Sequence, residues 1–239
     1  MLSPAAIRLR ALLAVALGLT ASASAQPSAE AVVEAWADGW DRAWGRADRV
    51  VLTERAEQSV EGPRRDLRIE TEGTLTLAPG RRPERRVDET RVNGRRAERE
   101  RGPRGHDRLR RAFGPAGREV LAPARLPIDW LPRAEPVRLA EDQVDGRAAW
   151  RVDLRSSAFE VLSVWFSRSE RAPQLLRARG EGRRPGDGRV VRDLRFARVD
   201  GLDLPQRSET AFTGRQRRRL RDYVVTLRAE STYAVRGVD

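Results

Sequence analysis

The sequence predicts an α+β protein that is mostly β, with an antiparallel sheet preceded by one amphipathic helix. Near the N-terminus, apolar residues recur at helical spacing. Later in the chain, apolar and polar residues alternate with a period of two, as in half-buried strands. Turn signals that contain glycine or proline separate these runs. The chain of 239 residues is long enough to bury a sizeable core in one domain.

The first 25 residues have the pattern of a cleavable signal peptide. Arg8 and Arg10 precede an apolar run over residues 11–19, and small residues follow up to Ala25. The apolar run is shorter than the roughly 20 residues that a membrane-spanning helix needs. We therefore expect cleavage after Ala25, a single domain over residues 26–239, and export to the periplasm.

Arginine dominates the charge of the chain. All 47 basic residues are arginine, against 35 acidic ones, and the formal net charge is +12. A cationic surface attracts phosphate and carboxylate groups, which in a cell envelope belong to anionic membrane surfaces or acidic proteins. Nucleic acid is not an expected partner of an exported protein. Cysteine is absent, so the chain has no disulfide and no acylated cysteine.

Residues 28–44 predict the amphipathic helix, with Ser28 as its N-cap. Trp36, Trp40 and Trp44 follow one another at a spacing of four residues and so share one side of this helix. Two interpretations are open. The stripe packs against a sheet, or it forms one wall of an apolar cavity.

Residues 67–77 predict the first strand, with Leu67, Ile69, Thr71, Gly73, Leu75 and Leu77 on one face. A second strand is predicted through Val87 and Val92, and Asn93-Gly94 after it is a strong hairpin signal, with a returning strand expected over residues 95–101. Residues 102–136 predict irregular structure, with one short helix near 107–113 and an apolar loop over 126–132 that packs onto the domain. Further strands are predicted over 148–154, 159–167, 175–180, 189–199, 204–212 and 220–235.

The residues offer no catalytic, cofactor or metal site. His106 is the only histidine and lies in a polar segment, cysteine is absent, and there is no nucleophile elbow. The many carboxylates alternate with arginines, as in the sequence from Glu98 to Arg101, which is typical of cross-strand ion pairs. We therefore expect a protein that is not an enzyme.

Short motifs occur in an order that resembles the LolA-like group of periplasmic lipoprotein carriers and outer-membrane lipoprotein-sorting proteins. They are Gly73-Thr74-Leu75-Thr76-Leu77 before a proline turn, Val92-Asn93-Gly94-Arg95, Val144-Asp145-Gly146-Arg147, Val164-Trp165-Phe166 with the downstream Pro173, and Val199-Asp200-Gly201-Leu202-Asp203-Leu204-Pro205. The resemblance covers roughly residues 30–235. It implies a curved antiparallel sheet that forms an incomplete barrel, with an apolar concave side under a helical or loop lid.

The resemblance also implies the residues that bind lipid. Trp36 and Trp40 would face the sheet from the helix. The cavity would be lined by Leu75, Leu77, Trp150, Val152, Trp165 and Tyr223, although alternation in one sequence does not say which face is inward.

Two functions follow as hypotheses. The first is a soluble periplasmic carrier or sensor for a lipid, lipopeptide or acylated protein, which binds in an apolar cleft of the curved sheet. The alternative is a non-enzymatic envelope domain with a filled core. Such a domain would dock through a basic, arginine-rich face onto an anionic membrane surface or an acidic envelope protein.

Overall fold

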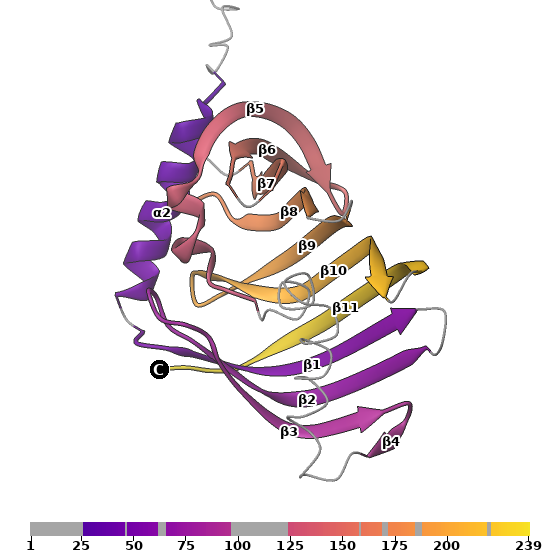
Figure 1. Cartoon of the computed structure of the whole chain (residues 1–239). Coiled ribbons are helices and arrows are strands. Elements are labelled where there is room, and N and C mark those ends of the chain that lie inside the picture. Colours follow the sequence, from indigo (N-terminus) through magenta and orange to yellow (C-terminus); the bar gives the residue numbers. More distant parts are fainter. Residues whose placement is uncertain are drawn as a thin grey trace, which may run out of the picture.

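The fold is one open antiparallel sheet of eleven strands that curves strongly around a single long helix (Figure 1). A computed structural model describes residues 26–45, 47–61, 66–96, 124–157, 159–168, 172–184, 188–218 and 221–239. The expected signal peptide, His106 and the predicted helix near 107–113 lie outside these ranges. Within the described part of the chain, no helix is both long and apolar enough to cross a membrane.

The helix and strands follow the chain in a simple meander. The helix is α2 (Ala29–Trp44), and the strands in sheet order are β4 (Arg95–Arg96), β3 (Glu84–Val92), β2 (Leu67–Leu77), β1 (Val50–Glu61), β11 (Arg221–Val238), β10 (Leu202–Arg218), β9 (Gly188–Val199), β8 (Leu175–Arg184), β7 (Val161–Ser167), β6 (Arg147–Arg155) and β5 (Glu135–Val144). Two 3₁₀ helices, η1 (Pro127–Asp129) and η2 (Leu131–Arg133), precede β5. The sheet is not closed into a barrel.

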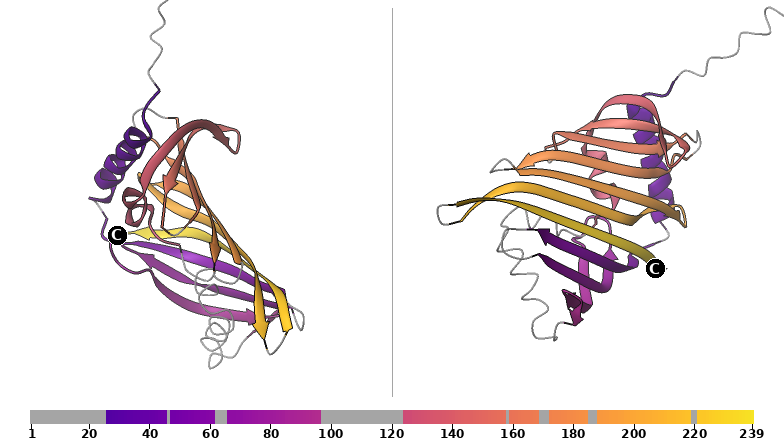
Figure 2. Two further views of the ribbon diagram at one scale, coloured as in Figure 1. Left: turned by 45° about the horizontal axis from the view of Figure 1, so that its top comes forward. Right: turned by 90° about the vertical axis from the view of Figure 1, so that its right-hand side faces the viewer.

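The helix forms where the sequence predicts it. The Ser28 hydroxyl accepts a hydrogen bond from the Ala31 amide at 3.1 Å, which satisfies one of the amides left free at a helix start. Val32, Trp36 and Trp40 are buried along one side of α2. The helix stands across one end of the strands (Figure 1), and a second view shows the sheet curling beside it (Figure 2).

The main core lies on the concave face at the end of the strands that α2 covers. It joins the helix to inward residues of strands far apart in the sheet order, such as Leu52 of β1 and Val164 of β7. These residues meet in one cluster because the sheet bends around the helix. A second cluster lies on the same face at the far ends of the strands and contains Val60, Ile69, Val190, Phe212, Val225 and Leu227.

The turns that the sequence predicts are present. Asn93, Asp145 and Asp200 have φ values of 49°, 53° and 52°, and each is followed by a glycine with positive φ. Such pairs suit two-residue hairpins, because their twist matches that of the strands they join. Of the returning strand expected over residues 95–101, the structure describes β4, which covers Arg95 and Arg96.

Two strands were missing from the sequence prediction. In β1, inward positions are occupied by Glu54 and Gln58, so the apolar alternation is broken. In β5, which forms one edge of the sheet, most side chains are exposed or half-buried. Both strands form because antiparallel partners with apolar inward residues lie beside them.

Candidate functional site

A cavity of about 540 Å³ opens on the concave face of the sheet. One wall is the segment that contains η1 and η2, and a second is the connection between β6 and β7. The floor consists of inward residues of neighbouring strands, namely Leu162 of β7, Ala178 and Gly180 of β8, and Arg192 and Leu194 of β9. A cavity of this size falls within the range of roughly 300–1,000 Å³ that is usual for small-molecule sites.

Small residues on β8 let an aromatic ring lie against the floor. A Cβ atom at Gly180 would come within 2.8 Å of the ring of Phe159, which enters from the connection between β6 and β7. Only glycine leaves room for this ring at the strand. Together with Trp130 on the opposite wall, Phe159 gives the cavity an aromatic lining.

Charged groups border the cavity. Arg125 and Arg133 are exposed side chains of the wall that contains η1 and η2. Asp129 accepts a hydrogen bond from the Gly80 amide at 2.8 Å, which ties this wall to the turn between β2 and β3. Arg155 donates to both carboxylate oxygens of Glu135, at 3.0 and 2.7 Å. The cavity therefore combines an apolar and aromatic interior with guanidinium groups at its border.

Most residues that were predicted to bind lipid lie together in the main core. Trp36, Trp40, Leu75, Leu77 and Val152 are at most 2% exposed. The ring centroids of Trp36 and Trp40 are 5.7 Å apart. The tryptophan stripe thus packs against the sheet, and none of these five residues lines the cavity described above. Trp150 is half-buried on the same face, beneath the guanidinium of Arg168 at 4.4 Å.

The prediction that Trp165 shares the inner face is wrong. Val164 pairs with Val152 on the inner side, whereas Trp165 pairs with Arg151 and points to the outer face. There it packs with Val144, Ala149 and Leu176 and donates a hydrogen bond to Asp142 at 2.9 Å. The run Val161–Ser167 is apolar at most positions, so its alternation did not reveal the inward side. The side chain of Tyr223 lies outside what the structure describes.

Trp36 is held by a buried carboxylate. Asp203, 1% exposed, accepts hydrogen bonds from the Trp36 indole at 2.9 Å and from the Leu175 amide at 2.8 Å. It also accepts two from Arg198, at 2.8 and 2.9 Å. Asp203 therefore ties α2 to the beginnings of β8 and β10.

A polar band crosses the concave face between the two apolar clusters. It consists of the buried inward residues Glu54, Gln58, Thr71, Ser208 and Thr210. Glu54 is 2% exposed and pairs with Arg85 at 2.5 Å. Burial raises the pKa of Glu54 above its ordinary value, although Arg85 acts in the opposite direction. Burial and the nearby Glu54 raise the pKa of Tyr233 to about 12.

The raised pKa of Glu54 predicts a particular pH dependence. The folded state binds the Glu54 proton more tightly than the unfolded state, so the stability from this group is full below its unfolded pKa. That stability is lost as pH rises through the folded pKa. The stability of the wild type relative to Glu54→Gln should therefore fall as pH rises above the ordinary pKa of a glutamate, about 4, as measured by urea unfolding.

Glu181 provides the control with the opposite sign. Hydrogen bonds from Arg189 and Arg179 lower the pKa of Glu181. The contribution of Glu181 to the free energy of unfolding is therefore present above its pKa in the unfolded state. It is lost as pH falls through its pKa in the folded state. Equal pH trends for Glu54→Gln and Glu181→Gln would contradict this assignment.

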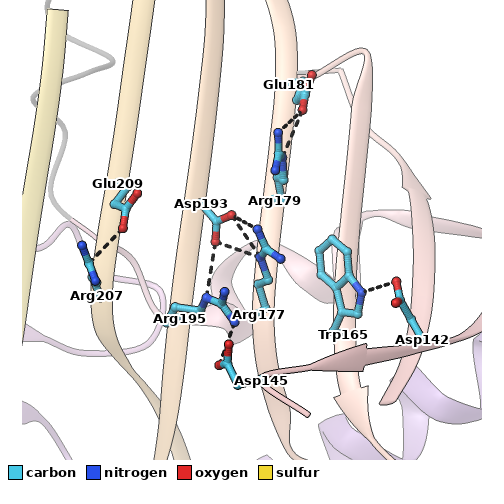
Figure 3. A network of polar contacts seen from close by, with 10 residues as sticks. All are labelled: Asp142, Asp145, Trp165, Arg177, Arg179, Glu181, Asp193, Arg195, Arg207 and Glu209. Carbon is cyan, nitrogen blue, oxygen red and sulfur yellow. Dashed lines mark hydrogen bonds and ion pairs between the residues drawn. The ribbon is translucent and has the colours of Figure 1, made fainter. Parts of the chain in front are cut away.

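The outer face carries a network of acids and arginines rather than charge of one sign. Arg177 pairs with Asp193, Arg195 bridges to Asp145 at 3.0 Å, and Arg179 pairs with Glu181 at 2.7 Å (Figure 3). Similar pairs continue across the sheet to Arg207 and Glu209 (Figure 3). The predicted ion pairs between acids and arginines are confirmed for these strands. Exposed pairs of this kind contribute little stability, about 0–1 kcal/mol each.

Sequence reasoning missed the residues that form the cavity. The apolar segment 126–132 was correctly predicted to pack onto the domain, and Leu126 and Leu131 are at most 1% exposed. Asp129 and Trp130 of this segment line a wall of the cavity, which only the spatial arrangement reveals. The one available signal was a tryptophan, Trp130, between two prolines and two arginines.

No protein-family model matches the sequence, and no curated protein is significantly similar to it. Several solved structures match this chain with low TM-scores, and three of them are described below. A LolA superfamily protein of Nitrosomonas europaea shares 12% identity, with coverage of 90% of this chain and 96% of that one and a TM-score of 0.34. A DUF1329 family protein of Desulfovibrio piger shares 13% identity, with coverage of 90% of this chain and 96% of that one and a TM-score of 0.38.

The third is a domain of Vibrio parahaemolyticus described as an outer-membrane lipoprotein-sorting protein. It shares 12% identity, with coverage of 89% of this chain and 95% of that one and a TM-score of 0.36. Two of these three structures are described as a LolA superfamily protein and a lipoprotein-sorting domain, the group that the sequence motifs resemble.

Proposed function

We propose that this protein is an exported, non-enzymatic carrier or sensor that binds a lipid, or the acyl chain of a lipidated molecule, in the cavity on its concave face. The observation that carries the proposal is the lining of that cavity. Leu162, Leu194, Phe159 and Trp130 provide an apolar interior, and arginines border it. This is the arrangement that an amphiphile with a chain and a polar head requires.

The energetics favour a chain over a small polar ligand. Each buried methylene contributes about 0.8 kcal/mol, so a chain of several methylenes on this floor gives useful affinity. The main core beside the cavity is already filled by Trp36, Trp40 and their neighbours. The acyl chain therefore belongs in the cavity between the wall that contains η1 and η2 and strands β7 to β9, which the predicted residues do not line.

The alternative is docking through a basic face, and the described outer face supports it less. Arginines such as Arg177, Arg179 and Arg207 are paired with acids at their own or neighbouring positions. A surface of balanced pairs exerts a weaker attraction on an anionic partner than a surface of one sign.

Native mass spectrometry with solvent extraction tests the proposal. The exported protein, purified without detergent, should carry a lipid adduct. Replacing Leu194 with tryptophan fills the floor of the cavity and should abolish the adduct. The matched control is Val191→Trp on the same strand. Val191 lines a groove on the outer face, so this change leaves the cavity open.

Retention of the adduct in Leu194→Trp would place the lipid elsewhere and overturn the assigned site. A clean apo mass for the wild type, together with no binding of added single-chain amphiphiles, would overturn the carrier function itself. Circular dichroism of both variants establishes that each is folded before its adduct is compared.

A further inference from the structure

Two arginines on the cavity wall have no acidic partner among the residues that the structure describes. Arg125 and Arg133 lie eight positions apart in the segment that contains η1 and η2, and both line the cavity. Within the ranges that the structure describes, neither guanidinium group is within 4.0 Å of a carboxylate oxygen or makes a hydrogen bond. On the outer face, by contrast, many arginines are paired with acids.

The acidic groups nearest to these arginines along the chain are already engaged. Asp129 lies between them in sequence and accepts the Gly80 amide at 2.8 Å. Glu135 receives both of its hydrogen bonds from Arg155. Among the residues that the structure describes, no acid therefore neutralises the positive charge of Arg125 and Arg133 at the border of the cavity.

Guanidinium groups match the oxygens of phosphate and carboxylate, to which they can donate two parallel hydrogen bonds. Here they stand beside an apolar floor that contains Leu162 and Leu194. Resting on the proposed carrier function, we infer that the ligand is a single-chain or multi-chain amphiphile with an anionic head. Arg125 and Arg133 bind its phosphate or carboxylate, and the chain lies on the floor.

The same arrangement of arginines disfavours amphiphiles with cationic or neutral head groups. A choline or other quaternary ammonium group would face two guanidinium groups, which repel it. A neutral hydroxyl would form weaker hydrogen bonds than an anion does. Head charge is therefore the property that the site discriminates, whereas chain length is limited only by the size of the cavity.

Isothermal titration calorimetry on the full mature chain tests this inference with two probes that have the same chain. Dodecyl phosphate has an anionic head, and dodecyl phosphocholine has a zwitterionic one. The wild type should bind dodecyl phosphate at least about tenfold more tightly, because its head is a net anion, whereas the trimethylammonium group of dodecyl phosphocholine offsets the charge of its phosphate and is repelled by the arginines. Raising the salt concentration should reduce this preference, since the arginines are exposed.

The double variant Arg125→Gln/Arg133→Gln should lose the preference and bind the two probes with similar affinity. The matched control is Arg138→Gln/Arg147→Gln. It removes two exposed arginines that do not line the cavity, so the net charge falls equally. The control should keep the preference.

Inorganic phosphate separates a lipid head from a free anion. It should not displace dodecyl phosphate at equal concentration, because it lacks the chain; displacement would overturn the inference by showing a simple anion site. Equal binding of both probes by the wild type would also overturn the inference, while leaving the carrier function in place. Binding of neither probe would count against the carrier function as well.

Discussion

Replacing Asp203 with alanine is expected to lower the free energy of unfolding by about 3–4 kcal/mol, because it leaves buried donors without their acceptor. These buried donors are the indole of Trp36 and the amide of Leu175, and the more exposed guanidinium of Arg198 also loses its carboxylate partner. The loss should also loosen α2, since Asp203 is the polar link from that helix to β8 and β10. Urea unfolding followed by circular dichroism measures the change.

Asp145 provides the comparison for an exposed acid. Its side chain is 74% exposed and pairs with Arg195 at 3.0 Å. Asp145→Ala should cost less than about 1 kcal/mol, as surface ion pairs usually do. Similar costs for the two alanine variants would show that the Asp203 network does not anchor the helix.

Replacing Trp40 with alanine is expected to lower the free energy of unfolding by about 3–5 kcal/mol, through lost burial and the void that remains. Trp40 is 2% exposed and stacks on Trp44 with ring centroids 6.0 Å apart. Because Trp40 does not line the cavity, the molecules that remain folded should bind dodecyl phosphate with unchanged affinity. Urea unfolding and calorimetry at low temperature measure the two effects separately.

Trp130→Ala is the matched variant, for which we expect a larger effect on binding than on stability. Trp130 is half-buried and lines the cavity, so its loss should weaken amphiphile binding more than it lowers stability. A second variant, Trp40→Phe, keeps an aromatic ring and removes an indole N–H that has no hydrogen-bond partner among the described residues. It should be milder than Trp40→Ala. Weaker binding by folded Trp40→Ala would return this residue to the binding site.

The sequence predicts local structure well where the physical cause lies within a few neighbouring residues. The Ser28 cap, the helix through Trp44 and the Asn93-Gly94 turn depend on hydrogen bonds and φ values within a few residues. The strand over residues 67–77 is equally clear, because its inward positions are apolar or small. In each case the physical cause is contained in the segment itself.

Strands β1 and β5 show where this reasoning stops. The inward Glu54 of β1 is tolerated because Arg85, from a strand two places away, pairs with it. No property of residues 50–61 reveals that partner. Trp165 shows the same limit, because an apolar run contains no sign of which side the sheet will bend toward.

By itself, the sequence determined the amphipathic helix, most of the antiparallel strands, and the alternation of acids with arginines. These features follow from the periodicity of side chains along a single element. The tertiary structure decided that the predicted tryptophans Trp36 and Trp40 fill a core, and that the cavity lies between strands β7 to β9 and the wall that contains η1 and η2. The reason is curvature: the bend of the sheet brings distant elements together, and a cavity forms where the side chains that meet there are too small to fill the space.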